Sequence, residues 1–403
     1  MFKRRWALSL IIISLMLLPG CWSRKELNEL AVVMALGVDL HEKGFTVSAQ
    51  VLNSGSLGKQ KENSFGSLPV VTYKATGATI PDALQRMLSS APRLMYLSHI
   101  RVLVLGEGLA RKGISDVLDF VARDHQLRDD FYMLVAKGSK ADEVLEIMTP
   151  FEHVPASSLY SSIMVANKNW AATGKVTIKT FVTELERGGS NPILSGVEVH
   201  GNVDTGSSLK NIQATTPKTM LHHAGIAVFQ KDKLVGWLDE SASKAVNYML
   251  NGVNTTIGNI PCPGDDGSVG FIIYGAKRTY GVKLNEEGRP EFSVKLKIEA
   301  NVNAVQCTID LSKAANMEEI GHILEDKFNS NISRHIKKVQ QEYGSDIFGF
   351  GEELHRKYPK AWKKYRENWD EVFRTSPVSV KTEVQMRRVG SIVQSLERQM
   401  EEK

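Results

Sequence analysis

Residues Phe292 to Val302 alternate between apolar and polar side chains without a fault. Apolar residues at every second position place one face of a strand against a core and leave the other face to water. The pattern therefore predicts a half-buried strand in an antiparallel sheet. Further along, residues Glu318 to Tyr343 carry apolar side chains at helical spacing. They predict a long amphipathic helix, so the C-terminal part combines strands with a helix that has one apolar face.

Strands and short helices also alternate in the N-terminal part. Residues 31–36 and 45–51 predict an antiparallel pair of strands joined by a turn at 41–44. Further strands are expected at 70–75, 100–105 and 131–136, and helices at 79–88, 114–122 and 139–148. This order indicates one sheet covered by helices. The strands are too few for a doubly wound fold and the first pair is antiparallel, so the predicted class is α+β with mixed or antiparallel sheets.

The length of the chain allows more than one core. Single hydrophobic cores stop growing near about 250 to 300 residues, and the chain has 403. Near the middle of the chain, a stretch rich in Gly, Ser, Asn and Thr with weak periodicity marks a domain boundary. We predict three domains and a leader: 1–20 as a signal peptide, 21–187 as an N-terminal α+β domain, 188–220 as a linker or small middle domain, and 221–403 as a C-terminal α+β domain.

The first residues have the layout of a bacterial secretory signal peptide. Lys3, Arg4 and Arg5 precede an almost wholly apolar run at 7–18, which ends in Leu-Pro-Gly-Cys at Cys21. The run is shorter than the roughly 20 residues that a membrane-spanning helix needs. A positive segment, a short apolar run and a cysteine at the cleavage site predict an exported lipoprotein. In that chemistry the thiolate of Cys21 takes a diacylglyceryl group, and Cys21 becomes the acylated first residue of the mature protein.

Net charge and cysteine content limit the possible partners and disulfides of the protein. The net charge of +5 includes three basic residues of the leader, so about +2 remains, which argues against a nucleic-acid partner bound through its phosphates. Two cysteines remain besides Cys21, at Cys262 and Cys307. In an oxidising compartment they could form a disulfide. Two buried free thiols fit the sequence equally well, because free cysteine behaves as a small apolar residue.

Known catalytic and metal-binding patterns are absent from the sequence. It contains no GxSxG, HExxH, GxxxxGK[ST] or EF-hand spacing. His222 and His223 are adjacent, and neighbours on a strand point to opposite faces, so they would chelate one ion poorly. We therefore predict no catalytic residues, no cofactor and no metal site.

Three other features allow two interpretations each. The charged triplets at 123–125 and 128–130, and Glu107, fit either an acid–base site or solvated ion pairs, and we favour the ion pairs because these are common on surfaces. An aromatic set repeats at helical spacing with lysines opposite, at Trp362, Tyr365, Trp369 and Phe373. It fits either a core stripe or a helix that docks on a membrane or partner. We favour the core.

Several segments together resemble one family, the C-subunit lipoproteins of spore nutrient germinant receptors, known as Ger(x)C. The resembling segments are 21–30 running into 35–39, 98–100 through Gly106-Glu107-Gly108, Arg123-Asp124 with Arg128, the hairpin at Gly236, and 346–351 before 358–362. They span nearly the whole chain after the leader, so the resemblance does not depend on a single motif.

The resemblance implies a non-enzymatic subunit, anchored through Cys21 on the outer face of the spore's inner membrane. It would act beside an integral-membrane A-type subunit and a transporter-like B-type subunit in sensing small nutrients and starting germination. The family implies an α+β, three-domain architecture and supplies no catalytic residues. Only Cys21 carries over, as the lipidation site. Two other functions stay open: a lipid-anchored receptor that itself binds the nutrient, and, more remotely, an exported enzyme acting on spore wall or lipid.

Overall fold

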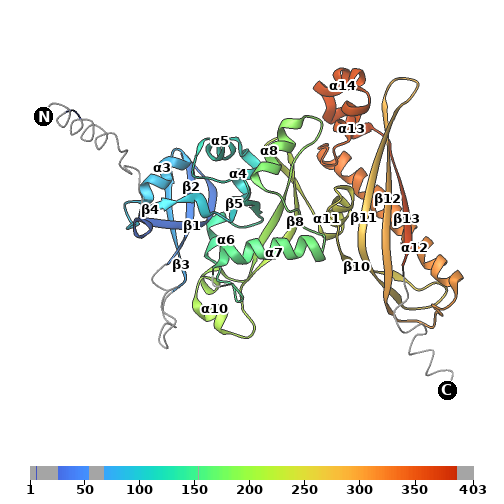
Figure 1. The fold of residues 1–403 in the computed structure, drawn as a ribbon, viewed down its shortest axis with the longest axis horizontal. Coiled ribbons are helices and arrows are strands. Elements are labelled where there is room, and N and C mark those ends of the chain that lie inside the picture. Colours follow the sequence, from blue (N-terminus) through green and yellow to red (C-terminus); the bar gives the residue numbers. More distant parts are fainter. Residues whose placement is uncertain (1–5, 7–25, 54–67, 153, 388–403) are drawn as a thin grey trace.

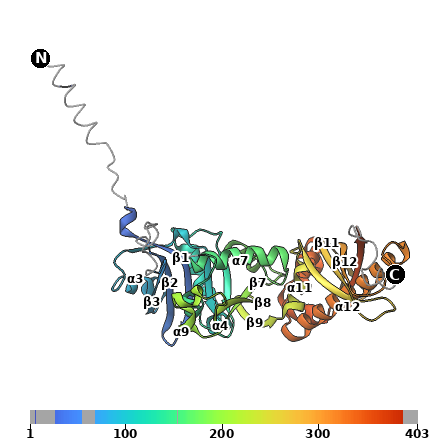
Figure 2. The ribbon, with the colours of Figure 1, turned by 90° about the horizontal axis from the view of Figure 1, so that it is seen from below.

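The chain folds around two β-sheets that lie at different positions along the long axis of the molecule (Figures 1 and 2). The computed structural model describes residue 6 and residues 26–53, 68–152 and 154–387. The larger sheet lies toward the N-terminal end and the smaller sheet toward the C-terminal end (Figure 1). Among the described residues, helices fall short of the length and apolar character needed to cross a membrane.

The larger sheet is mixed, with the strand order β3-β2-β1-β5-β6-β7-β8-β9, and β4 pairs beside β1. Its strands are β1 (Leu30–His41), β2 (Gly44–Leu52), β3 (Val70–Gly77), β4 (Leu94–Tyr96), β5 (Val102–Gly106), β6 (Tyr132–Ala136), β7 (Ile193–His200), β8 (Met220–Gln230) and β9 (Lys233–Leu238). The centre, β1-β5-β6-β7, is parallel, and the outer pairs are antiparallel. A parallel centre requires crossover helices, which is why helices follow β5 and β6.

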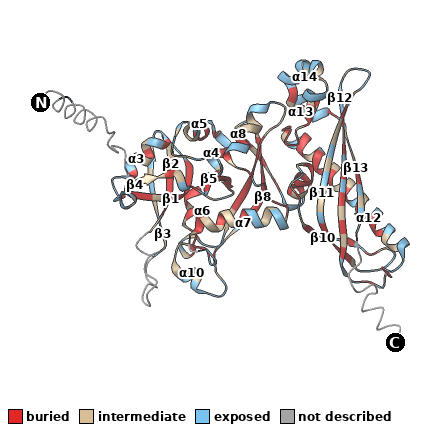
Figure 3. Cartoon of the chain, in the orientation of Figure 1, coloured by how far each residue is buried: buried red, intermediate tan, exposed pale blue. Residues whose placement is uncertain are grey.

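Helices cover both faces of this sheet. They are η1 (Leu27–Glu29), α3 (Ile80–Met87), η2 (Leu97–His99), α4 (Glu107–Lys112), α5 (Ser115–Arg123), α6 (Ala141–Glu146), α7 (Pro155–Asn169), α8 (Ile178–Arg187), α9 (Val203–Gly206) and α10 (Leu209–Gln213). Alternate residues of the central strands enter two cores. Leu103 and Leu105 share one with α3, α4 and α5, and Val102 and Val104 share the other with α6 and α7. Burial on both faces makes these strands almost continuously apolar (Figure 3).

The smaller sheet has the order β10-β11-β12-β13, antiparallel except for the parallel pair β12-β13. Its elements are α11 (Glu240–Met249), β10 (Thr256–Pro261), β11 (Ser268–Leu284), β12 (Pro290–Val305), α12 (Ala314–Lys338), the π-helical turn η3 (Val339–Tyr343), α13 (Phe350–Lys357), α14 (Pro359–Tyr365), η4 (Arg366–Asn368), α15 (Trp369–Thr375) and β13 (Val378–Met386). The apolar stripe of α12, including Leu324 and Phe328, shares a core with the buried face of β12, including Val294 and Leu296.

The predicted α+β class with mixed sheets is confirmed. The alternating run falls in β12 and the long helix in α12 continued by η3. The stretch 188–220 begins with a loop, continues with β7, which pairs with β6 and β8 inside the larger sheet, and then contains α9 and α10. Weak periodicity there reflects short elements joined by turns.

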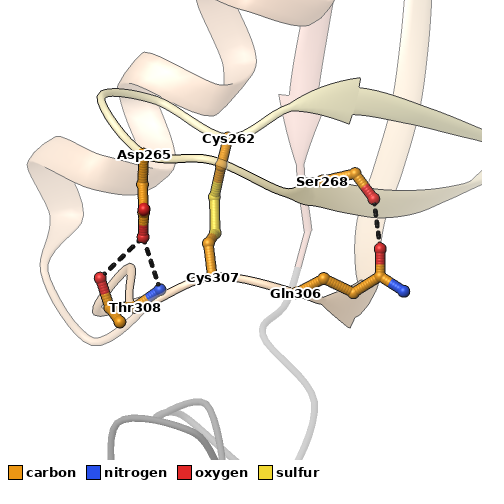
Figure 4. Close-up of a disulfide and its surroundings, with 6 residues drawn as sticks. All are labelled: Cys262, Asp265, Ser268, Gln306, Cys307 and Thr308. Atoms are coloured by element: carbon orange, nitrogen blue, oxygen red, sulfur yellow. Dashed lines mark hydrogen bonds between the residues drawn. A yellow bond between two sulfur atoms is a disulfide. The ribbon is translucent and has the colours of Figure 1, made fainter.

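Cys262 and Cys307 form a disulfide, which decides between the two alternatives that the spacing left open. It links the segment after β10 to the segment after β12 (Figure 4). Both cysteines are buried. Beside it, Asp265 accepts hydrogen bonds from the backbone N–H of Thr308 at 3.0 Å and from its hydroxyl at 2.8 Å. The bridge therefore joins two loops that are also tied by polar contacts.

Replacing both cysteines, as Cys262→Ala with Cys307→Ala, is expected to lower the free energy of unfolding by roughly 4 kcal/mol, because the bridge closes a loop across 45 positions of the unfolded chain. Urea unfolding of the two proteins measures the difference. As a control, reductant should destabilise the wild type to a similar extent and leave the double variant unchanged. Two freely titrating thiols in the unreduced, denatured wild type would contradict the pairing.

The junction of the two halves as a candidate functional site

The sequence predicted one site residue, Cys21, and it lies outside the described residues. The described ranges contain no group of three or more His, Cys, Asp or Glu side chains placed to hold a metal ion. His222 and His223 lie on β8 and have different partners. The ring of His222 stacks on that of His200 with 4.2 Å between centroids, and His223 Nε2 lies 3.2 Å from the hydroxyl of Ser162.

The charged triplets form exposed ion pairs. Arg123 pairs with Asp119 at 2.8 Å, one turn earlier on α5, and Arg128 pairs with Asp130 at 2.6 Å. Each arginine holds the pKa of its carboxylate partner below the ordinary value through direct hydrogen bonds. A carboxylate held ionised by an exposed arginine is not prepared to act as a general acid.

Glu107, the first residue of α4, connects three elements. Its carboxylate accepts hydrogen bonds from the backbone of Gly138 at 3.0 Å, from the indole of Trp237 at 3.1 Å and from Arg111 at 2.6 Å. Burial raises the pKa of Glu107, but these three donors outweigh that effect, and the net shift is downward. The side chain is therefore a structural tie between the ends of β5, β6 and β9.

The aromatic set lies in the core, although not on one helix. A break at η4 separates α14 from α15, so Trp362 and Trp369 lie on two short helices whose rings meet edge to face at 5.4 Å. Both indoles are buried, and Phe373 is fully buried. The single continuous helix face inferred from the spacing is wrong, because the chain turns at residues 366–368 to bring both indoles into the same core.

A buried carboxylate lies at the centre of that region. Asp346 accepts hydrogen bonds from the backbone N–H groups of Phe348 at 3.1 Å, Gly349 at 3.0 Å and Gly351 at 2.8 Å, and from the indole of Trp369 at 3.1 Å. The loop that carries it turns through Gly349, whose φ of +80° favours glycine. One side chain thus fixes the start of α13 and its distance from α15.

The same loop joins the C-terminal half to the larger sheet. Asn191, just before β7, donates its backbone N–H to the carbonyl of Asp346 at 2.7 Å. The Ser345 hydroxyl donates to the carbonyl of Phe229 at 2.5 Å, and the Tyr343 hydroxyl donates to the carbonyl of Trp237 at 2.8 Å. These bonds attach the segment after α12 to β8, to β9 and to the loop before β7.

Two glycines make close contact at this junction. A Cβ added to Gly351 would lie 2.6 Å from the backbone of Gly189, which belongs to the loop before β7 and has a φ of +85°. A steric clash with backbone atoms at this distance cannot be relieved by rotating a side chain. The junction therefore requires glycine on both sides, and it joins the halves through backbone contact as well as hydrogen bonds.

Beside the junction lies a cleft of about 640 Å³ between α8, β11 and α13. Its charged lining comes from both halves: Lys175, Glu184, Arg187, Arg278, Glu352, Glu353 and Arg356. Arg187 lies 3.0 Å from Glu184 on its own helix and 3.6 Å from Glu352 on α13. The guanidinium of Arg278 lies over the ring of Tyr280, 3.8 Å from its centroid. The cleft combines charged groups of both signs with apolar walls that include Phe181, Ile193 and Phe348.

Sequence reasoning did not identify the junction or the cleft as sites. The Asp346 segment appeared only as part of a resemblance. A local signal was present, since an Asp followed by Gly-x-Gly predicts a turn in which the carboxylate caps nearby backbone N–H groups. The partners in the other half, such as Asn191 and Phe229, are more than 100 positions away and leave no signal in a single sequence.

We expect Asp346→Asn to lower the free energy of unfolding by about 3 kcal/mol at acidic pH, because an amide NH₂ would face two of the buried donors. Burial, opposed mainly by the Gly351 N–H, raises the pKa of Asp346 to about 6. The folded state therefore holds this proton more tightly than the unfolded state does. Its contribution to stability is complete below about pH 4 and falls as the pH rises toward 6.

The measurement is urea unfolding of wild type and Asp346→Asn at steps from pH 4 to 7. The stability advantage of the wild type should shrink by up to about 3 kcal/mol across that range. Taking the difference between the two proteins removes the contribution of the other carboxylates. An advantage that stays constant or grows with pH would show that the carboxyl is ionised throughout.

Comparisons with known proteins match nearly the whole chain. The family described as spore germination protein N-terminal domain matches residues 23–199, and the family described as spore germination B3/GerAC like, C-terminal, matches residues 224–390. Spore germination protein KC of Bacillus subtilis (strain 168) is 29% identical over 387 residues, covering 94% of this chain and 95% of that protein. Spore germination protein B3 of the same organism is 24% identical, covering 91% and 92%.

A solved structure has the same fold. The crystal structure of the GerBC protein aligns with a TM-score of 0.56 and 18% identity, covering 88% of this chain and 97% of that one. Since the alignment extends over both halves, the two sheets belong to one shared architecture.

Proposed function

Given that this chain belongs to the GerAC-like family of spore germination proteins and is a C subunit of a germinant receptor, we propose that it is lipid-anchored. The thiol of Cys21 would carry a diacylglyceryl group and hold the protein on the outer face of the spore's inner membrane. There it would act beside an integral-membrane A-type subunit and a transporter-like B-type subunit in nutrient-triggered germination. The observation that carries the proposal is the leader that ends in Cys21, on a chain whose family acts in germination.

The anchor has a physical reason. A single acyl chain gives only marginal membrane residence, whereas two chains hold a protein stably. Confinement to the membrane surface also raises the effective concentration of the protein beside its partners, as linking two binding modules does. A subunit that catalyses no reaction can then contribute to germination through assembly with its partners alone.

The rigid junction supports a role in assembly and signal transmission. The buried Asp346 cap, the hydrogen bonds from Ser345 and Tyr343, and the contact of Gly189 with Gly351 hold the two sheets in one relation. A partner that binds across both halves would therefore meet a surface that is already ordered and would lose little conformational entropy on binding. We propose no enzymatic activity, because the polar clusters of the described residues are ion pairs and caps.

Replacing the lipidated residue tests the proposal. Cys21→Ala is expected to move the protein from the membrane fraction to the soluble fraction, and to reduce the germination response through loss of anchoring. Fractionation of spores with an antibody against the chain, together with nutrient-induced loss of optical density, measures both effects. Ser23→Ala, which keeps the cysteine, is the matched control. The proposal would fail for a Cys21→Ala protein that stayed membrane-bound and fully responsive.

The cleft favours a second candidate, a lipid-anchored receptor that itself binds a small nutrient. Its 640 Å³ and convergent charged groups fit a small polar molecule. A ligand at 100 times its Kd should stabilise the folded protein by about 2.7 kcal/mol and raise its Tm by several degrees. Thermal unfolding with a panel of amino acids and sugars measures this, and Arg278→Ala should abolish the shift. An unchanged Tm with every nutrient would exclude this candidate.

A further inference from the structure

One face of the smaller sheet carries a cluster of lysines. The buried face of β12 packs on α12, so the intervening residues of β12 point to the opposite, outer face of the sheet. Lys277 on β11 is paired in register with Lys297 on β12, and Lys295 on β12 is paired with Lys381 on β13. All four side chains are exposed. We call this set, Lys277, Lys295, Lys297 and Lys381, the lysine face.

The arrangement costs stability. Like charges directly opposite each other on neighbouring strands are destabilising. Lys297 has Glu383 at 3.8 Å. For the other three lysines, no carboxylate lies within 4 Å among the residues that the structure describes. The nearby Glu299 is occupied by Arg387 at 2.7 Å. In a chain of almost balanced charge, this face therefore carries a local excess of positive charge.

Exposed apolar side chains continue the same face. Ile257 on β10 is 58% exposed and is paired in register with Ile272 on β11. Tyr274, 50% exposed, lies where the register shifts between Ile273 and Gly275, three positions before Lys277. A sheet face that combines lysines with an exposed tyrosine and isoleucine suits a membrane–water interface. There the amines meet headgroups, and apolar and aromatic groups enter the boundary region.

We propose that the lysine face binds anionic phospholipid headgroups. The face lies at the opposite end of the elongated molecule from the start of β1 (Figure 1). With the proposed anchor at Cys21, it would give the protein two membrane attachments at its two ends and lay the long axis along the membrane. A second attachment adds to the stable lipid anchor, because two linked attachments hold more strongly than either alone. The inference deepens the proposed function, but lipid binding by this face does not depend on the acyl chains.

The test uses the chain from Trp22 to Lys403, which lacks the leader and Cys21. Sedimentation with vesicles of phosphatidylcholine, with or without about one third phosphatidylglycerol, measures the partition coefficient at about 50 mM and 500 mM salt. Binding should require the anionic lipid and weaken at high salt. Lys277→Gln with Lys295→Gln and Lys381→Gln should lower the partition coefficient about 100-fold.

The matched control replaces three exposed lysines of the other half, as Lys112→Gln with Lys210→Gln and Lys218→Gln, and should bind as the wild type does. Thermal unfolding checks that both triple variants are folded. Equal loss in the control variant, equal binding to neutral vesicles, or no vesicle binding by the wild type would each overturn the proposal. If the wild type ignored vesicles while the lysine-face variant impaired germination, the face would instead contact an acidic protein partner. A failed Cys21→Ala test leaves these outcomes unaffected.

Discussion

One buried carboxylate organises the loop through which the two halves of the molecule meet. Asp346 has no access to solvent, and four N–H donors converge on it from its own loop and from Trp369. An unsatisfied donor in that position would cost about 1 to 3 kcal/mol. The cap therefore fixes the loop, and the loop in turn places Ser345 and Tyr343 against strands of the larger sheet. Other polar contacts join the halves as well, such as Gln230 to Asp370 at 2.7 Å and Asn247 to the carbonyl of Ala171 at 2.8 Å.

A fixed relation between the halves suits a protein that works by presenting surfaces. The cleft beside the junction draws its charges from α8 on one side and α13 on the other, and Arg187 reaches Glu352 across it. The smaller sheet adds a basic face at the far end. The cleft depends on where the junction holds the second sheet, whereas the lysine face is formed within that sheet by strand register.

Local patterns predicted most of the elements. The alternation at 292–302 and the stripe in α12 succeeded because burial of one face imposes a period of 2 on a strand and 3.6 on a helix. The aromatic spacing at 362–373 predicted the core but missed the break at η4, since two short helices can keep the same spacing as one long helix. The strand β7, in the stretch after residue 188, was not predicted from the sequence. Its short apolar run is buried on both faces and therefore has no clear period.

By itself, the sequence determined the α+β class, the main strands and helices and the resemblance to a germination family, and it also predicted an exported chain with Cys21 as its lipidation site. It did so because each depends on neighbouring residues or on a contiguous motif. Only the tertiary structure decided the disulfide between Cys262 and Cys307, the Asp346 junction, the cleft and the lysine face. Each of these joins residues far apart in the chain, and such pairings follow from strand register and from how the two sheets pack.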